Sequence, residues 1–292
     1  MVQLLRERQL LAGVLLRGEW NQGKQQIEAQ FRQAGIAVHY APQNNDESAI
    51  RAMTDWQTTL GVAFCCGGKI PAALARAPKY GVVNLHASPL PEYRGADPIY
   101  WQIRNGEAST MLTAHMVDDG WDTGPVVAQL PIDISPRDTH HSVFGKLCHQ
   151  LPGLLDRITE SLTNSQHLEL HPQPEGIHHK APRVTEQNLL IDWRHSSAQQ
   201  ICDQVRAGNP QFGGARLSMG QGHAQLLQAT PSQMPAYQAP AGTLIHLSPD
   251  HGLVVATKDS SLRLDIISNA EGVFDGYRFA QLYNLSAGMK FN

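Results

Sequence analysis

Cysteine, net charge and long apolar runs are all scarce in this sequence of 292 residues. The four cysteines are too few and too scattered for a disulfide framework, and the adjacent pair Cys65–Cys66 is poorly placed to form a bridge. Free thiols are typical of a reducing compartment, so we expect a cytoplasmic protein. No apolar run approaches the roughly 20 residues of a membrane helix, and the N-terminus lacks the layout of a signal peptide. We therefore expect no membrane partner.

The charge of the chain is close to balanced. There are 23 Lys and Arg residues against 26 Asp and Glu, which gives a formal net charge of −3. Proteins that bind nucleic acid normally use an excess of positive charge to contact phosphates, so no nucleic-acid partner is expected. The hydrophobic fraction of 41% is sufficient for the core of one large domain or two of moderate size.

The first half of the chain has the pattern of an α/β domain. Short runs rich in Val, Ile and Leu alternate with polar stretches of helical period, as in βαβ units around a parallel sheet. Strands are predicted at residues 11–16, 36–40, 60–65, 82–86, 112–117 and 125–134. Helices are predicted at residues 2–8, 25–34, 46–56, 98–104 and 141–162, the last with Thr139 as its N-cap.

The predicted helix at residues 2–8 stands where a doubly wound α/β domain normally begins with a strand and a glycine-containing turn. The sequence thus predicts a Rossmann-like, mostly parallel sheet that lacks its usual first strand. The alternative is that the first strand lies upstream of Met1.

A change of texture separates this half from the rest of the chain. Residues 164–186 are polar and contain Pro172, Pro174 and Pro182, which leaves little that could pack in a core. We expect a linker there.

The remainder of the chain favours short strands. A helix predicted at residues 198–206 is followed by four or five strand candidates between residues 216 and 267, separated by Gly, Pro and Asp turns. We therefore predict a larger domain over residues 1–163, the linker over 164–186, and a smaller β-rich, barrel-like domain over 187–292.

Asn84 and His86 are the first residues that suggest chemistry. They lie two apart on the predicted strand at 82–86, so both side chains point to one face, at the carboxyl end where α/β sheets bind ligands. An amide next to an imidazole suits the stabilisation of an oxyanion or the transfer of a proton. The same spacing is also typical of a capped loop entry with no catalytic role.

Asp122 is the second candidate. It lies in a turn, Asp118–Gly124, between two predicted strands, where a carboxylate could raise the pKa of a histidine and relay a proton. The turn lacks the spacing of a calcium loop, and it could also be a plain surface turn.

Other reactive side chains give weaker signals. Cys65 and Cys66 could form a reactive thiol site, although a small buried packing pair is the simpler interpretation. The histidine pairs His140–His141 and His178–His179 do not predict a metal site, because adjacent side chains diverge on any regular element and no i,i+4 His pair is present.

Together these residues resemble a known family. The pattern Asn84-x-His86, followed by Ser88-x-Leu90-Pro91, Gly95 and the Asp122 turn, is similar to the formyltransferases that use N10-formyltetrahydrofolate. Residues 189–215 are similar to the C-terminal domain of the methionyl-tRNA and sugar N-formyltransferases of this family.

The resemblance implies roles for particular residues. Asn84, His86 and Asp122 would be catalytic: the first two stabilise the tetrahedral oxyanion, and Asp122 holds His86 charged and helps to move the amine proton. N10-formyltetrahydrofolate would be the co-substrate, and no metal is implied. The residues implied to bind the co-substrate are Phe64, Cys66, Gly67, Lys69, Ile70, Leu90 and Gly120. Those implied to bind the acceptor are Ser88, Tyr93, Arg94 and Gly95.

The acceptor is the part that the resemblance leaves open. Methionyl-tRNA formyltransferases carry a long basic insertion after the second strand, whereas residues 16–24 are short and nearly neutral here. We therefore expect a small-molecule amine, either an amino-sugar nucleotide or a precursor of a secondary metabolite or siderophore. Hydrolysis of formyltetrahydrofolate and folate binding without catalysis are the alternatives. The oligomeric state stays open, since no heptad pattern is evident.

Overall fold

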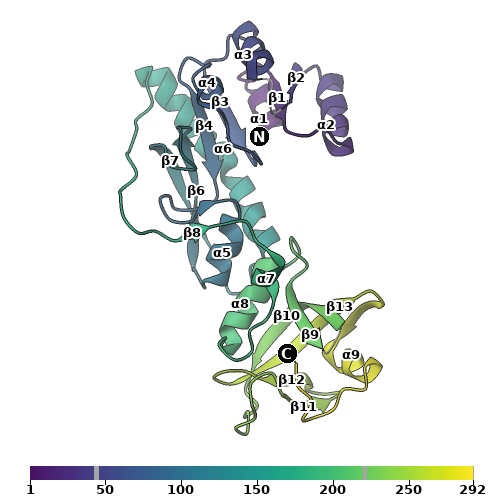
Figure 1. The fold of residues 1–292 in the computed structure, drawn as a ribbon. Helices are drawn as coiled ribbons and strands as arrows, with labels where there is room; N and C mark the ends of the chain where they lie inside the picture. Colours follow the sequence, from purple (N-terminus) through teal and green to yellow (C-terminus); the bar gives the residue numbers. More distant parts are fainter. Residues whose placement is uncertain (43–45, 220–221, 292) are drawn as a thin grey trace. The chain divides into compact units, whose positions relative to one another are not determined.

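The computed structural model describes residues 1–42, 46–219 and 222–291 (Figure 1). The chain forms two compact units that interleave in sequence. The N-terminal unit comprises residues 1–96, 111–132 and 147–180, and the C-terminal unit comprises residues 97–110, 133–146 and 181–292. The predicted domain boundaries at residues 163 and 187 therefore stay a prediction about the sequence order, which the division into compact units does not follow.

The first part of the chain alternates helices and strands. Its elements, in order, are α1 (Val2–Glu7), β1 (Val14–Arg17), α2 (Gln22–Gln33), β2 (Val38–Ala41), α3 (Asp46–Asp55), β3 (Gly61–Phe64), α4 (Ala72–Ala75), β4 (Val82–His86), β5 (Arg94–Gly95), α5 (Pro98–Arg104), β6 (Ser109–Met116), β7 (Val126–Asp133) and α6 (His140–Ser165).

The second part contains most of the antiparallel strands. Its elements are β8 (Lys180–Ala181), α7 (Glu186–Leu189), α8 (Ala198–Gly208), β9 (Ala215–Met219), β10 (Gly222–Ser232), β11 (Leu244–Ser248), β12 (Gly252–Ala256), β13 (Ser261–Asn269), β14 (Gly272–Asp275) and α9 (Gly276–Leu282).

Two separate sheets form in the N-terminal unit. β1 and β2 pair in parallel, and a four-stranded sheet has the order β3-β4-β6-β7, in which β3 and β4 are parallel and β4 and β6 antiparallel. Within residues 1–42 and 46–219, no strand joins β1 to β3. The predicted α/β class is confirmed, and the parallel part of the sheet is divided at the place where a first strand would lie.

The local predictions hold closely because burial and propensity agree in these segments. β4 and α5 have the predicted bounds, and β4 buries Val82, Val83 and Leu85. Thr139 caps α6 as predicted, since its hydroxyl oxygen accepts a hydrogen bond from the Ser142 backbone N–H at 3.3 Å.

The C-terminal unit contains an antiparallel sheet with the order β11-β12-β13-β10-β9, and β14 pairs with β13. α8 packs against β10, and the core gathers large side chains such as Trp193, Ile201, Leu226, Leu264 and Phe279. The predicted β-rich domain is confirmed. In the described residues the pairing ends at β9 and β11, so the ladder is an open one and the predicted barrel does not close.

The segment between α6 and α7 is largely irregular, with the two-residue strand β8 and a single bridge from His171 to Val126. Over the residues that the structure describes, no helix combines the length and the hydropathy that a bilayer crossing requires.

Candidate active site

β4 and β6 bring three polar side chains together. The strands pair antiparallel with Asn84 opposite His115, and His86 follows two residues after Asn84 at the carboxyl end of β4. His86 and His115 are both buried, and their ring centroids lie 6.3 Å apart. The sheet register therefore places two imidazoles beside one amide in the interior of the N-terminal unit.

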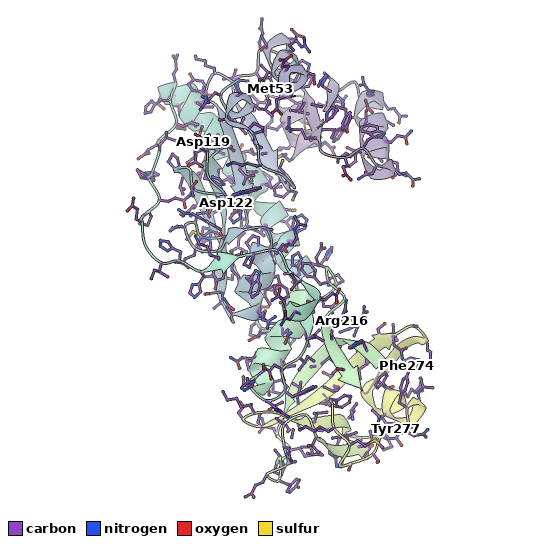
Figure 2. All side chains as sticks on the ribbon, in the orientation of Figure 1. Met53, Asp119, Asp122, Arg216, Phe274 and Tyr277 are labelled. Atoms are coloured by element: carbon purple, nitrogen blue, oxygen red, sulfur yellow. The ribbon has the colours of Figure 1, made fainter. Side chains whose placement is uncertain are left out.

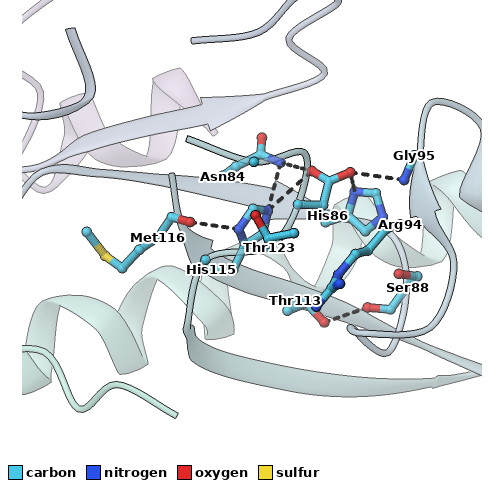
Figure 3. Close-up of polar contacts among 12 residues, drawn as sticks. Asn84, His86, Ser88, Arg94, Gly95, Thr113, His115, Met116 and Thr123 are labelled. Atoms are coloured by element: carbon cyan, nitrogen blue, oxygen red, sulfur yellow. Dashed lines mark hydrogen bonds and ion pairs between the residues drawn. The ribbon is translucent and has the colours of Figure 1, made fainter. Parts of the chain in front are cut away.

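Asp122 lies among these side chains (Figure 3). Its Oδ2 is 3.8 Å from His86 Nδ1 and accepts a hydrogen bond from the Gly95 backbone N–H at 3.0 Å. Its Oδ1 is 3.5 Å from both Asn84 Nδ2 and His115 Nε2. The residue has a left-handed φ of 56°, which aspartate tolerates better than most residues. One carboxylate thus contacts every other member of the cluster.

Both imidazoles are oriented by backbone carbonyls. His86 Nε2 lies 3.0 Å from the carbonyl oxygen of Tyr93, and His115 Nδ1 lies 2.9 Å from that of Met116. A carbonyl oxygen can only accept, so each of these nitrogens carries a proton. The second nitrogen of each ring then faces Asp122, and in neutral His115 it accepts the Asn84 amide at 3.1 Å. A proton taken up by either ring would therefore lie next to the carboxylate.

The electrostatics of the cluster differ from expectation at His86. Burial lowers the pKa of His86, and this outweighs the opposing effects of the Asp122 charge and the Tyr93 carbonyl, with the charge of His115 lowering the pKa further. The expectation that Asp122 keeps His86 charged is therefore wrong in its net direction. The ring is neutral at neutral pH because it has lost more hydration than the carboxylate restores.

Asp122 itself stays ionised. Burial acts to raise the pKa of its carboxyl, but the His115 hydrogen bond, the His86 charge and the Gly95 N–H outweigh burial and lower the pKa. The cluster at neutral pH is thus a carboxylate between two imidazoles, His86 neutral, which is an arrangement suited to accepting a proton.

A cleft opens directly beside the cluster. Ile70, Val117 and Trp121 supply apolar surface, and Asn84, His115 and Asp122 form its inner end; it is completed by Cys66, Gly68, Lys69, Asp118 and Gly120. Figure 2 shows Asp119 and Asp122 near each other on the turn after β6, and the Asp119 carbonyl oxygen accepts a hydrogen bond from Lys69 Nζ at 2.5 Å. Apolar walls with polar backbone groups at the edge fit the flat pterin ring of a folate.

Four of the residues expected to bind the co-substrate line this cleft: Cys66, Lys69, Ile70 and Gly120. The other three lie elsewhere. Phe64 ends β3 and Gly67 is exposed, and neither lines the cleft; Leu90 is buried and lines a separate cavity with Val126 and Ile158.

The residues expected to bind the acceptor contact other parts of the protein. Ser88 is buried and its hydroxyl donates to the Glu92 carbonyl oxygen at 2.7 Å, while Tyr93 is buried and stacks on His179. Arg94 donates to the Gln173 side chain, and Gly95 donates to Asp122. In this structure, these four residues hold the loop after β4 in place.

Two further expectations concern cysteine and metal. Cys65 and Cys66 are both exposed, so their interpretation as a buried packing pair is wrong; β3 ends before them, and nothing covers the turn. Among the residues with described positions, no group of three His, Cys, Asp or Glu side chains is arranged to hold a metal ion.

The sequence interpretation missed His115 and Gln173. His115 has a signal, since it is a lone polar ring within a strand that otherwise buries Leu112 and Ala114. Gln173 has none, because it lies in the irregular segment after α6, yet its amide donates to the carbonyl oxygens of Asp122 and Gly124 at 2.9 and 2.7 Å.

Comparisons with known proteins agree with this geometry. The profile of the formyl transferase family matches residues 21–156, and that of the formyl transferase C-terminal domain matches residues 183–278. A methionyl-tRNA formyltransferase of Synechococcus sp. (strain JA-3-3Ab) is 32% identical over 223 residues, which cover 74% of this chain and 67% of that protein. The chain belongs to the formyltetrahydrofolate-dependent formyltransferases. The resemblance inferred from the sequence motifs is thereby confirmed.

Other relatives extend the comparison. The methionyl-tRNA formyltransferase of Kosmotoga olearia is 27% identical over 258 residues, 88% of this chain and 80% of that protein. HypX from Aquifex aeolicus, solved in complex with tetrahydrofolic acid, has a similar fold with a TM-score of 0.63 at 17% identity; the match covers 94% of this chain but only about half, 48%, of HypX. An N-formyltransferase from Helicobacter canadensis, solved with folinic acid and dTDP-3-aminofucose, gives a TM-score of 0.56 at 18% identity, over 89% of this chain and 98% of that one.

Proposed function

We propose that this protein transfers the formyl group of N10-formyltetrahydrofolate to the amine of a small-molecule acceptor. The observation that carries the proposal is the cluster of Asn84, His86, His115 and Asp122 at the inner end of the cleft. In the reaction, the acceptor nitrogen forms a bond to the formyl carbon and the bond from that carbon to N10 breaks. The amine loses one proton, and N10 gains one.

Each side chain has a role that its contacts support. The Asn84 amide has two N–H groups and donates one toward the oxygen that becomes negative as the amine attacks. His86 is neutral, with its free nitrogen facing Asp122 at 3.8 Å, so it accepts the amine proton and the carboxylate stabilises the resulting imidazolium. His115 is a positioning residue, because its ring orients the Asn84 amide and Asp122.

The favoured acceptor is an amino-sugar nucleotide. The chain carries a net charge of −3, and only a short connection separates β1, which ends at Arg17, from α2, which begins at Gln22, so the long basic insertion expected of a tRNA-binding relative is missing there. The Helicobacter canadensis N-formyltransferase of similar fold was solved with a nucleotide-linked amino sugar. A cytoplasmic location stays a prediction.

The test is a competition between acceptors. The purified protein is incubated with N10-formyltetrahydrofolate and either dTDP-3-aminofucose, a panel of hydroxylamine and diamine siderophore precursors, or methionyl-tRNA, and the formylated product is measured by mass spectrometry. We expect product with a small-molecule amine. Efficient formylation of methionyl-tRNA alone would replace the proposal by the second candidate.

Methionyl-tRNA is that second candidate because the curated relatives at 32% identity are methionyl-tRNA formyltransferases. A reaction without acceptor gives the remaining comparison. Formate release that no acceptor accelerates would indicate a hydrolase, and absence of turnover together with tight folinic acid binding would indicate a folate-binding protein.

A further inference from the structure

The irregular segment after α6 crosses the catalytic loops of the N-terminal unit. We call residues 166–180 the strap. It is held at three points: His171 forms a two-way backbone bridge with Val126, Gln173 contacts the Asp122 turn, and the His179 carbonyl oxygen accepts from the Tyr93 backbone N–H at 2.8 Å. The strap therefore touches both loops that supply the catalytic cluster.

Gln173 makes the contacts nearest to the chemistry. Its Nε2 donates to the backbone oxygens of Asp122 and Gly124 at 2.9 and 2.7 Å, and its Oε1 accepts from Arg94 Nε at 2.9 Å. A carboxamide has two N–H donors and an acceptor on one carbon, so this single side chain satisfies two carbonyls and one guanidinium at once. Neither glutamate nor methionine can make the same set of bonds.

The turn that Gln173 holds is constrained on its other side by β6. A Cβ atom on Gly124 would lie 1.9 Å from the Met116 carbonyl oxygen, so the turn packs directly on the strand. Asp122 adopts a left-handed backbone conformation there, with φ of 56°. Such a conformation persists only where the surroundings impose it, and Gln173 binds the carbonyl oxygens on both sides of Thr123.

We propose that Gln173 is a positioning residue for formyl transfer, which fixes the Asp122 turn and the Arg94 loop in the geometry that catalysis requires. The inference rests on the proposed function. Gln173 does not line the cleft beside Asn84, so it acts through Asp122 rather than on the substrate. Displacing a catalytic group by about 1 Å can cost about a hundredfold in rate.

The experiment compares Gln173→Met and Gln173→Glu with the wild-type protein. Methionine keeps the length without the bonds, and glutamate keeps the acceptor for Arg94 but presents an oxygen to two carbonyls. We expect kcat to fall at least about tenfold in both variants, with KM for N10-formyltetrahydrofolate within about twofold of wild type. Gln30→Met, on the exposed face of α2, is the matched control and is expected to have no effect.

A double variant separates positioning from general support of the fold. In an Asp122→Asn background, Gln173→Met should cost much less than in the wild type, because the two residues act as a unit. An equal cost in both backgrounds, or wild-type kcat in Gln173→Met, would overturn the inference.

Hydrogen exchange gives a readout that needs no substrate. Amides of residues 117–125 should exchange faster in Gln173→Met, while the free energy of unfolding stays within about 1 kcal/mol of wild type, as for a change outside the core. Unchanged exchange in this segment would refute the positioning of the turn. If the wild-type protein transfers formyl to no acceptor, the proposed function fails, and the exchange result alone then decides whether Gln173 fixes the turn.

Discussion

Buried carboxylates occur in both compact units, but their partners differ. In the C-terminal unit, Asp138 accepts from Lys146 at 2.5 Å, from the Ser135 N–H at 2.6 Å and from the Ser142 hydroxyl at 2.8 Å. In the N-terminal unit, Asp122 accepts one backbone N–H at 3.0 Å, and its other contacts are two imidazoles and an amide at 3.5 to 3.8 Å. The first carboxylate is saturated with donors, whereas the second has free capacity.

The difference in partners separates stability from catalysis. Burial acts to raise the pKa of Asp138, but Lys146 and the Ser135 and Ser142 hydrogen bonds lower it to about 2, so its charge is fixed. Asp203 is likewise paired with Arg206 at 2.8 Å, and both are largely buried. Lysine and arginine do not give up protons near neutral pH, but histidine does. A carboxylate between histidines can therefore take part in a proton transfer that a carboxylate on a lysine or arginine cannot.

The largest effect is expected for Asp122→Asn. The substitution keeps an acceptor for the Gly95 N–H but removes the charge that stabilises a protonated His86, so kcat should fall about a thousandfold, or about 4 kcal/mol. Asp133→Asn, an exposed carboxylate on β7, is the control. The measurement is steady-state formyl transfer, and a loss below tenfold would place Asp122 with the structural carboxylates.

Arg206→Met tests the saturated cluster. Arg206 binds Asp203 and also donates to the Asp138 carbonyl oxygen at 3.2 Å, so the variant leaves a buried carboxylate without its cation. We expect a loss of about 3 kcal/mol in the free energy of unfolding in urea, with kcat almost unchanged.

The double variant Asp203→Leu with Arg206→Met checks the reason for that loss. It removes both charges, so much of the stability should return. A double variant as unstable as Arg206→Met would mean that packing, not the unpaired charge, causes the loss.

Acid should destabilise the C-terminal unit through His140. Burial, opposed by the charge of Asp97 and assisted by that of His141, lowers the pKa of His140 to about 4 from an unfolded value of 6.5. The unfolded chain therefore binds the proton first: stability is complete above pH 6.5, falls as the pH drops toward 4, and loses about 2 kcal/mol between pH 7 and pH 5. Unfolding in urea at several pH values should show a flatter dependence for His140→Gln, and identical slopes would contradict the assignment.

The rate should also fall on the acid side, for a related reason in the other unit. Because the pKa of His86 is lowered from 6.5, the neutral ring is the form present at neutral pH, and protonation removes the base. Below that pKa we expect kcat/KM to drop about tenfold per pH unit. Two acceptors with different amine pKa values distinguish enzyme from substrate, because a limb that belongs to His86 does not move with the acceptor. A rate that falls only on the alkaline side would restore the charged His86.

The smallest effect is expected for Glu186→Gln. Glu186 faces Arg216 at 3.3 Å, but its side chain is 82% exposed, so water and salt screen the pair. The free energy of unfolding should change by less than about 0.5 kcal/mol. A larger change would show that exposure is a poor guide to which ion pairs matter in this protein.

Much of the fold followed from local patterns. The apolar runs at β4 and the amphipathic spacing in α5 and α6 predicted these elements because burial on one face imposes the period of the structure. β14 and α9 were not predicted, since Gly272–Asp275 and Gly276–Leu282 are short and acquire their order by pairing with β13 and packing in the core.

Three members of the catalytic cluster were predicted from the sequence, because Asn84 and His86 share a strand face and Asp122 lies in a turn with glycines on both sides. Their positions in the sequence could not show that His115 stands opposite Asn84, which depends on the antiparallel register of β4 and β6. Nor could they show that Gln173, about fifty residues after Asp122, binds the same turn.

The sequence by itself determined the class of fold, the family and the residue types available for chemistry, because these depend on periodicity and on motifs within one segment. The tertiary structure decided the charge of His86 and the distinction between a carboxylate that stabilises and one that reacts. Those properties depend on how much water burial removes and on which donors approach from distant segments, and neither can be read from one segment of the chain.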